Sequence, residues 1–105
     1  MDIAPEQVAE LQRAGTIQLV DVREPYEWEA GHIPGTRHVT LGEVAQEAET
    51  IDRETTVVFI CRVGGRSTMA ADAFRRAGYE AYSLAGGVLA WQARGLPFDG
   101  QVAEH

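Results

Sequence analysis

The 105-residue sequence predicts a single α/β domain in which an open parallel sheet carries helices on both faces. Short apolar runs of strand length alternate along the chain with segments whose apolar residues recur at helical spacing. Such alternation favours parallel strands joined by right-handed crossovers. The run TTVVFI at 55–60 contains only β-branched and aromatic residues, as in a central strand buried on both faces. With 45% of its residues hydrophobic, the chain can form one core.

The first half of the chain begins with a predicted helix over 5–14, which Pro5 starts and Gly15 ends. Residues 17–22 are a short apolar run and predict a strand that ends near Asp21. Turn-forming residues then surround a short helix within 24–35. We expect a second strand at 36–39, followed by a helix over 41–49, where apolar residues again follow helical spacing.

The second half repeats the order of strand, loop and helix. The strand at 55–60 runs into a loop at 61–66, and the helix that follows spans 67–78, closed by Gly78. A strand at 79–84, a final helix at 86–95 and a trailing coil at 96–105 complete the chain. We therefore expect one domain over 1–105, with its core at 5–98 and a tail at 99–105.

The charge of the chain restricts its partners. The formal net charge is −7, so neither nucleic acid nor an anionic membrane is an expected partner. All nine positively charged side chains are arginines, which leaves guanidinium groups and backbone amides as anion receptors. No stretch approaches the roughly 20 apolar residues that span a bilayer, and the first residues lack the pattern of a signal peptide. The expected location is the cytoplasm.

The chain has one cysteine, Cys61, so an internal disulfide is impossible. His32, His38 and His105 do not stand at ligand spacing from it, and we expect neither a metal nor a cofactor. A free cysteine at the end of an apolar strand is usually a small core residue. The alternative is a reactive thiol, and the residues that follow Cys61 favour it.

The loop after the central strand has the composition of an anion site. Ligands of open parallel sheets bind beyond the carboxyl ends of the strands, where Cys61 is the first residue. Gly64 and Gly65 allow successive backbone amides to turn inward at the start of the next helix. Together with Arg62 and Arg66, these amides should favour the nucleophilic thiolate.

Three segments of the sequence resemble the single-domain rhodaneses, a family of sulfurtransferases, and the resemblance covers nearly the whole chain. These segments are DVREPYEWEAGHIPGTRHV, CRVGGRS and LAGGVLAWQARGLP. The resemblance implies a small central parallel sheet with flanking helices and a sulfur-transfer cycle on the cysteine. It also implies that Asp21 and Arg23 support the structure.

The resemblance makes Cys61 the catalytic residue, which takes sulfane sulfur as a persulfide from a small donor such as thiosulfate or another persulfide. The loop backbone would surround the transferred sulfur, and an external thiol, or cyanide in the test tube, would remove it. A protein thiol is a possible acceptor. The expected substrate-binding residues are Arg62, Val63, Gly64, Gly65, Arg66 and Ser67.

Two alternatives remain open. The first is a sulfur carrier or protein-interaction module with little free turnover. The second is a phosphatase or arsenate reductase of the same fold, whose loop the resemblance implies to be one residue longer. We assign no chemistry to His32, the two tryptophans, Arg75, Arg76 or the acidic residues of 43–49.

Overall fold

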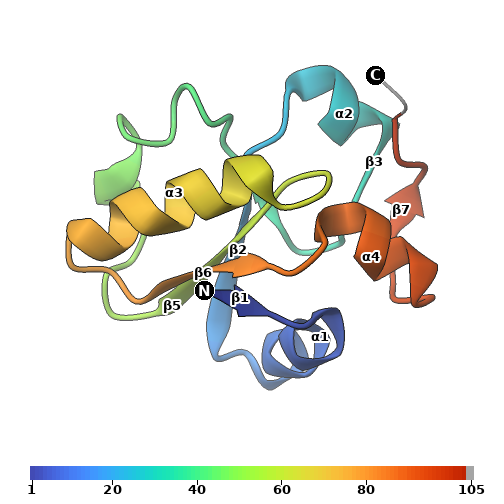
Figure 1. Cartoon of the computed structure of the whole chain (residues 1–105), viewed down its shortest axis with the longest axis horizontal. Helices are drawn as coiled ribbons and strands as arrows, with labels where there is room; N and C mark the ends of the chain where they lie inside the picture. Colours follow the sequence, from blue (N-terminus) through green and yellow to red (C-terminus); the bar gives the residue numbers. More distant parts are fainter. Residues whose placement is uncertain (104–105) are drawn as a thin grey trace.

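A five-stranded parallel sheet forms the centre of the computed structural model, which describes residues 1–103 (Figure 1). The strand order is β1-β6-β5-β2-β4, so β5 lies in the middle. A second, antiparallel sheet pairs β3 with β7. The strands are β1 (Asp2–Ile3), β2 (Ile17–Asp21), β3 (Gly31–His32), β4 (Arg37–His38), β5 (Thr56–Ile60), β6 (Ala81–Leu84) and β7 (Asp99–Gly100).

Helices cover both faces of the sheet, as predicted. Side chains of β5 alternate between two buried clusters: Val57 and Phe59 join α3 and the segment after β4, whereas Val58 and Ile60 join α1 and α4. In Figure 1, α3 accordingly lies on the opposite side of the sheet from α1. The helices are α1 (Pro5–Ala14), α2 (Pro25–Ala30), α3 (Gly65–Arg76) and α4 (Gly87–Ala93), with a 3-10 turn at Ala48–Thr50.

The predicted helix over 41–49 is wrong. Residues 41–47 form consecutive turns, and their backbone hydrogen bonds mostly span three residues, as from Gln46 to Glu43 and from Thr50 to Glu47. Gly42 weakens a helix, and Glu43 and Glu47 would stand four residues apart with like charges. Burial of Val44 and Ile51 in the core cluster that contains Phe59 holds the segment without a continuous run of α-helical hydrogen bonds.

Several boundaries also differ from the prediction. β1 was not predicted and adds an edge strand to β6, while the second strand shortens to Arg37–His38. α3 begins at Gly65, two residues early, and β6 begins at Ala81. α4 covers Gly87–Ala93 of the predicted 86–95.

The trailing coil contains β7, whose Asp99 pairs with His32 of β3. Residues 104–105 of that predicted tail lie outside the described part of the chain. Two-residue strands carry too little sequence pattern to be recognised, because their pairing depends on the rest of the fold. No helix within residues 1–103 has the length and apolar character needed to cross a membrane.

Candidate active site

Cys61 lies directly after β5, at the carboxyl edge of the sheet and between the ends of β2 and β6. Its side chain is buried, with 1% of its surface exposed. The chain then turns through residues 62–64 into α3. We call residues 61–66 the Cys61 loop. The central position of β5 places this loop where ligands of open α/β sheets bind.

The sulfur of Cys61 is surrounded by hydrogen-bond donors. The backbone amide of Gly64 donates to Sγ at 3.0 Å and that of Ser67 at 3.4 Å. The hydroxyl of Ser67 lies 3.4 Å from the same sulfur. Gly64 has a φ of 126°, a conformation that side chains other than hydrogen disfavour, and this conformation turns its amide inward. Donors in this arrangement stabilise negative charge on the sulfur.

Other amides of the loop are free to bind a second atom. Within residues 1–103, the N–H groups of Val63, Gly65 and Arg66 have no hydrogen-bond acceptor. Successive amides at the start of a helix form a nest for anions. The loop can therefore hold a negatively charged atom bonded to the Cys61 sulfur as well as the sulfur itself.

The start of α4 holds the Cys61 loop from the other side. Val88 donates its amide to the carbonyl of Cys61 at 2.9 Å, and Leu89 donates to the carbonyl of Arg62 at 3.2 Å. A side chain at Gly87 would overlap the carbonyl oxygen of Arg62. These contacts were missed from the sequence, where the two glycines at the start of the predicted helix, Gly86 and Gly87, were the available signal.

Arg66 forms an ion pair with a buried carboxylate that was not singled out from the sequence. Its two terminal nitrogens contact the two oxygens of Glu27 at 2.7 and 3.0 Å. The hydrogen bonds from Arg66 hold the pKa of Glu27 below its usual range against the opposing effect of burial, and the same pair raises the pKa of Arg66. Glu27 also accepts the amide of Glu24 in a capping box at the start of α2.

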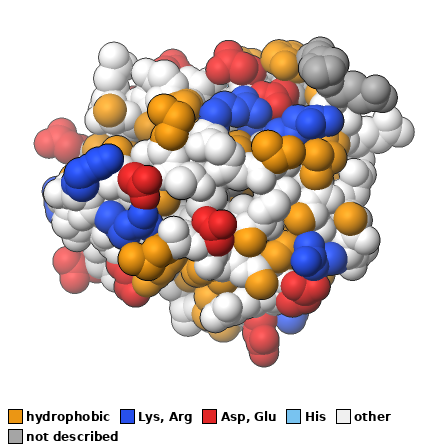
Figure 2. Space-filling model, in the orientation of Figure 1, with side chains coloured by type: hydrophobic (Ala, Val, Ile, Leu, Met, Phe, Trp, Pro, Cys, Tyr) orange, Lys and Arg blue, Asp and Glu red, His pale blue; other side chains and the backbone are white. Residues whose placement is uncertain are grey.

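Arg62 has a different environment. Its Nε donates to the carbonyl of Ala103 at 3.2 Å, and within residues 1–103 its terminal nitrogens make no hydrogen bond. Basic side chains stand beside hydrophobic ones over the region between α2, the start of α3 and α4 (Figure 2). Of the two arginines expected to attract a donor, Arg66 is thus paired with a carboxylate, and Arg62 has terminal N–H groups without an acceptor in the described part of the chain.

Asp21, the last residue of β2, and Arg23 lie at the carboxyl edge of the sheet, as Cys61 does, and both are fully buried. Arg23 donates to both carboxylate oxygens of Asp21 at 2.8 to 3.0 Å and to the carbonyl of Gly31 at 2.8 Å. The pair therefore connects the end of β2 with β3. Nearby, Trp28 stacks on His32 with ring centroids 3.6 Å apart.

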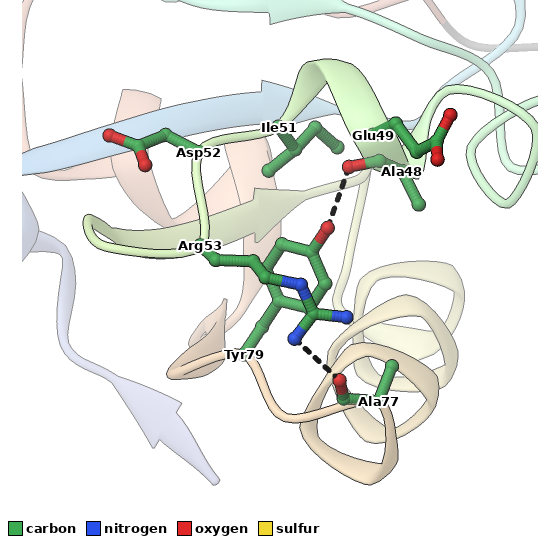
Figure 3. A pocket seen from close by; sticks show the side chains of 7 residues that line it. All are labelled: Ala48, Glu49, Ile51, Asp52, Arg53, Ala77 and Tyr79. Carbon is green, nitrogen blue, oxygen red and sulfur yellow. Dashed lines mark hydrogen bonds between the residues drawn. The ribbon is translucent and has the colours of Figure 1, made fainter.

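Hollows in the surface lie away from Cys61, around the C-terminal half of α3. One of about 550 Å³ opens beside the C-terminal end of α3, lined by Ala48, Glu49, Ile51, Asp52, Arg53, Ala77 and Tyr79 (Figure 3). Its polar groups bind each other: the Tyr79 hydroxyl donates to the carbonyl of Ala48, and Arg53 donates to that of Ala77. Within residues 1–103, no three His, Cys, Asp or Glu side chains come together as metal ligands would.

The fold and the sequence together define a class of protein. Residues 4–94 match the family of rhodanese-like domains, and the chain belongs to that family. The fold has a TM-score of 0.86 with the crystal structure of a rhodanese-related protein from Thermoplasma volcanium, which is 25% identical in sequence. That comparison covers 92% of this chain and 95% of the other.

Relatives extend the comparison to sulfur chemistry. The thiosulfate sulfurtransferase GlpE of Pseudomonas aeruginosa is 39% identical over 92 residues, which cover 87% of this chain and 83% of that protein. The transcriptional regulator Rv0324 of Mycobacterium tuberculosis is 41% identical over 97 residues, which cover 87% of this chain but 42% of the regulator. The same kind of domain therefore occurs within a longer protein.

Proposed function

We propose that the protein is a sulfurtransferase of the rhodanese type, in which Cys61 carries sulfane sulfur as a persulfide. The observation that carries this proposal is the set of amides in the Cys61 loop: two donate to Sγ, and within residues 1–103 those of Val63, Gly65 and Arg66 have no acceptor and could bind a further anionic atom. Similarity to a thiosulfate sulfurtransferase supports the same chemistry.

The reaction takes two nucleophilic steps. In the first, the Cys61 thiolate attacks the outer sulfur of thiosulfate; a new S–S bond forms, the donor's S–S bond breaks, and sulfite leaves with the electron pair. In the second, a thiolate or cyanide attacks the outer sulfur of the persulfide, and the electron pair of the S–S bond returns to Cys61. The product is a persulfide or thiocyanate. Neither step needs an added oxidant or reductant.

The residues of the Cys61 loop would have different roles in these two steps. The amides of Gly64 and Ser67 stabilise the thiolate, and the remaining amides would stabilise the charge once it lies on the outer sulfur. The terminal N–H groups of Arg62 would attract the donor's oxyanion towards a protein of net charge −7. Because its guanidinium binds Glu27, Arg66 would act mainly through its backbone amide.

The first test is the intact mass of the protein before and after incubation with thiosulfate. We expect a gain of one sulfur atom, which disappears when cyanide is added and is accompanied by thiocyanate. The Cys61→Ser variant, which keeps the size and burial of the side chain, should gain nothing. Equal loading of the variant, or no loading of the natural protein, would refute the proposal.

A second candidate function, a sulfur carrier that serves one protein partner, is favoured by exposed apolar side chains on α2, the Cys61 loop and α3. Four large hydrophobic side chains of residues 1–103 are more than half exposed: those of Met1, Tyr26 of α2, Val63 of the Cys61 loop and Met69 of α3. Exposed apolar groups on the elements that carry a reactive cysteine suit contact with a protein. The occurrence of a similar domain within a longer regulator fits this use. A carrier would load one sulfur and release thiocyanate slowly, whereas an enzyme would turn over steadily.

Phosphatase or arsenate chemistry is the third candidate. The loop from Cys61 to Arg66 is one residue shorter than the loop expected for a phosphatase of this fold. The resemblance to rhodaneses associates this shorter loop with sulfur transfer. An assay with an aryl phosphate decides this point: sustained hydrolysis that requires Cys61 would favour the phosphatase, and we expect none.

A further inference from the structure

We propose that Ser83 of β6 positions the hydroxyl of Ser67, so that this hydroxyl donates a hydrogen bond to the Cys61 sulfur in its thiolate form. Ser67 and Ser83 are the two serines of the chain. Ser67 lies in α3 and Ser83 in β6, and both are buried, at 0% and 1% exposure. The part of this inference that concerns sulfur transfer rests on the proposed function.

The side chains of Cys61, Ser67 and Ser83 form a short buried chain of hydrogen bonds. Sγ of Cys61 lies 3.4 Å from Oγ of Ser67, which lies 2.6 Å from Oγ of Ser83. The Ser67 hydroxyl also lies 3.2 Å from the carbonyl oxygen of Gly64. Ser67 therefore has three hydrogen-bonding neighbours, whereas the Ser83 hydroxyl, within residues 1–103, has Ser67 alone.

The number of hydroxyl protons determines which serine donates and which accepts in these hydrogen bonds. Each hydroxyl has one proton to donate. If Ser67 donated to Ser83, the proton of Ser83 would be buried without an acceptor, which is unfavourable. Ser83 therefore donates to Ser67, and the proton of Ser67 is left for either Cys61 or Gly64.

The charge on the sulfur decides between these two acceptors. The carbonyl of Gly64 already accepts the amide of Thr68 at 3.0 Å, whereas a thiolate gains a charge-assisted bond from the hydroxyl. The Ser67 proton thus turns to Cys61 when the sulfur is a thiolate. In the persulfide the negative charge lies on the outer sulfur, and the inner sulfur becomes a weaker acceptor.

This difference gives Ser83 a role in the second step of the cycle. When an acceptor attacks the outer sulfur, the S–S bond breaks and its electron pair returns to Cys61. A hydroxyl that is already oriented towards Sγ stabilises this leaving thiolate more than the persulfide before it. Ser83 is a positioning residue, because it acts through Ser67 and does not touch the sulfur.

The test is the Ser83→Ala variant, compared with Ser67→Ala and with the double variant. We expect alkylation of Cys61 by iodoacetamide to slow about 3- to 10-fold near pH 6, about the effect of one hydrogen bond, and to reach the natural rate in alkaline solution. Discharge of a preloaded persulfide to cyanide should slow by about the same factor. The double variant should match Ser67→Ala, since Ser83 acts only through Ser67.

Thr68→Ala removes a neighbouring hydroxyl from α3 that has no side-chain hydrogen bond within residues 1–103 and should leave both rates unchanged. A Ser83→Ala protein that unfolds at lower temperature but keeps the natural pH profile of alkylation would overturn the proposal, as would full additivity with Ser67→Ala. If the alkylation profile moves as expected while the natural protein takes no sulfur from thiosulfate, the positioning role stands and the proposed function fails.

Discussion

At its N-terminal end α3 begins in the Cys61 loop, whereas its C-terminal end borders the hollow lined by Arg53 and Tyr79 (Figure 3). The hollow is a sizeable concavity, yet its guanidinium and hydroxyl bind nearby carbonyls. Within the described residues, the Cys61 loop keeps three amide donors without an acceptor, next in sequence to a buried sulfur. The proposed sulfur chemistry thus rests on donors at a strand end that have no acceptor within residues 1–103, and the size of a cavity would be a poor guide to it.

The largest effect should come from Gly87→Ala, which disturbs the support of the loop. The new methyl group would overlap the carbonyl of Arg62, and a φ of +63° is unfavourable for alanine. We expect a loss of about 2–4 kcal/mol in the free energy of unfolding and at least a tenfold loss of persulfide loading, because displaced amides no longer face the sulfur. Denaturant titration and intact mass after thiosulfate measure the two effects.

Gly95→Ala is the matched control for this change. Gly95 also has a positive φ, of 70°, but a side chain there would meet no atom within 4 Å. The control should therefore lose about 1 kcal/mol of stability and keep its loading. If both variants load sulfur equally, α4 does not hold the loop in its working geometry.

The Cys61 loop also shows which features of the site the sequence could predict and which it could not. The strand at 55–60 and the cysteine after it were identified because a buried strand, two glycines and two arginines all follow local rules. The contacts of Glu27 with Arg66 and of Ser83 with Ser67 join residues 39 and 16 positions apart. Such pairs depend on the packing of separate elements, which no local pattern of residues describes.

Regular elements were predicted well where one periodicity dominated, as in α1. The segment 41–49 failed because its apolar residues serve tertiary burial: Val44 packs into the core cluster that also contains Ile51, while the backbone between them turns tightly. Helical spacing over nine residues was a weak signal, since like charges and Gly42 opposed it.

An intermediate effect is expected from Glu27→Gln, which breaks the ion pair at the loop end of α3. Near neutral pH the variant should be about 1–2 kcal/mol less stable, since the amide replaces a charge-assisted contact that is partly open to solvent. The folded-state pKa of Glu27 lies below its ordinary value of 4.5. Its contribution is therefore present above about that pH and is lost as the pH falls through the lower folded value.

Urea titrations at neutral and acidic pH measure this difference. The stability curves of the natural protein and Glu27→Gln should converge in acid, while Glu29→Gln, an exposed change on the same helix, should run parallel to the natural protein. A gap between natural protein and Glu27→Gln that stays constant with pH would show that the ion pair does not stabilise the fold.

The smallest effect should come from Tyr79→Phe at the hollow. This change removes the hydroxyl that donates to the carbonyl of Ala48, and the free energy of unfolding should fall by about 1 kcal/mol. Tyr82→Phe, whose hydroxyl contacts Glu80 at the surface, should cost less, because exposed groups exchange that contact for water. Neither variant should alter persulfide loading, since the hollow borders the end of α3 opposite to the Cys61 loop. If Tyr79→Phe lost persulfide loading while Tyr82→Phe kept it, the hollow would contribute to sulfur transfer. The separation of function between the two ends of α3 would then be wrong.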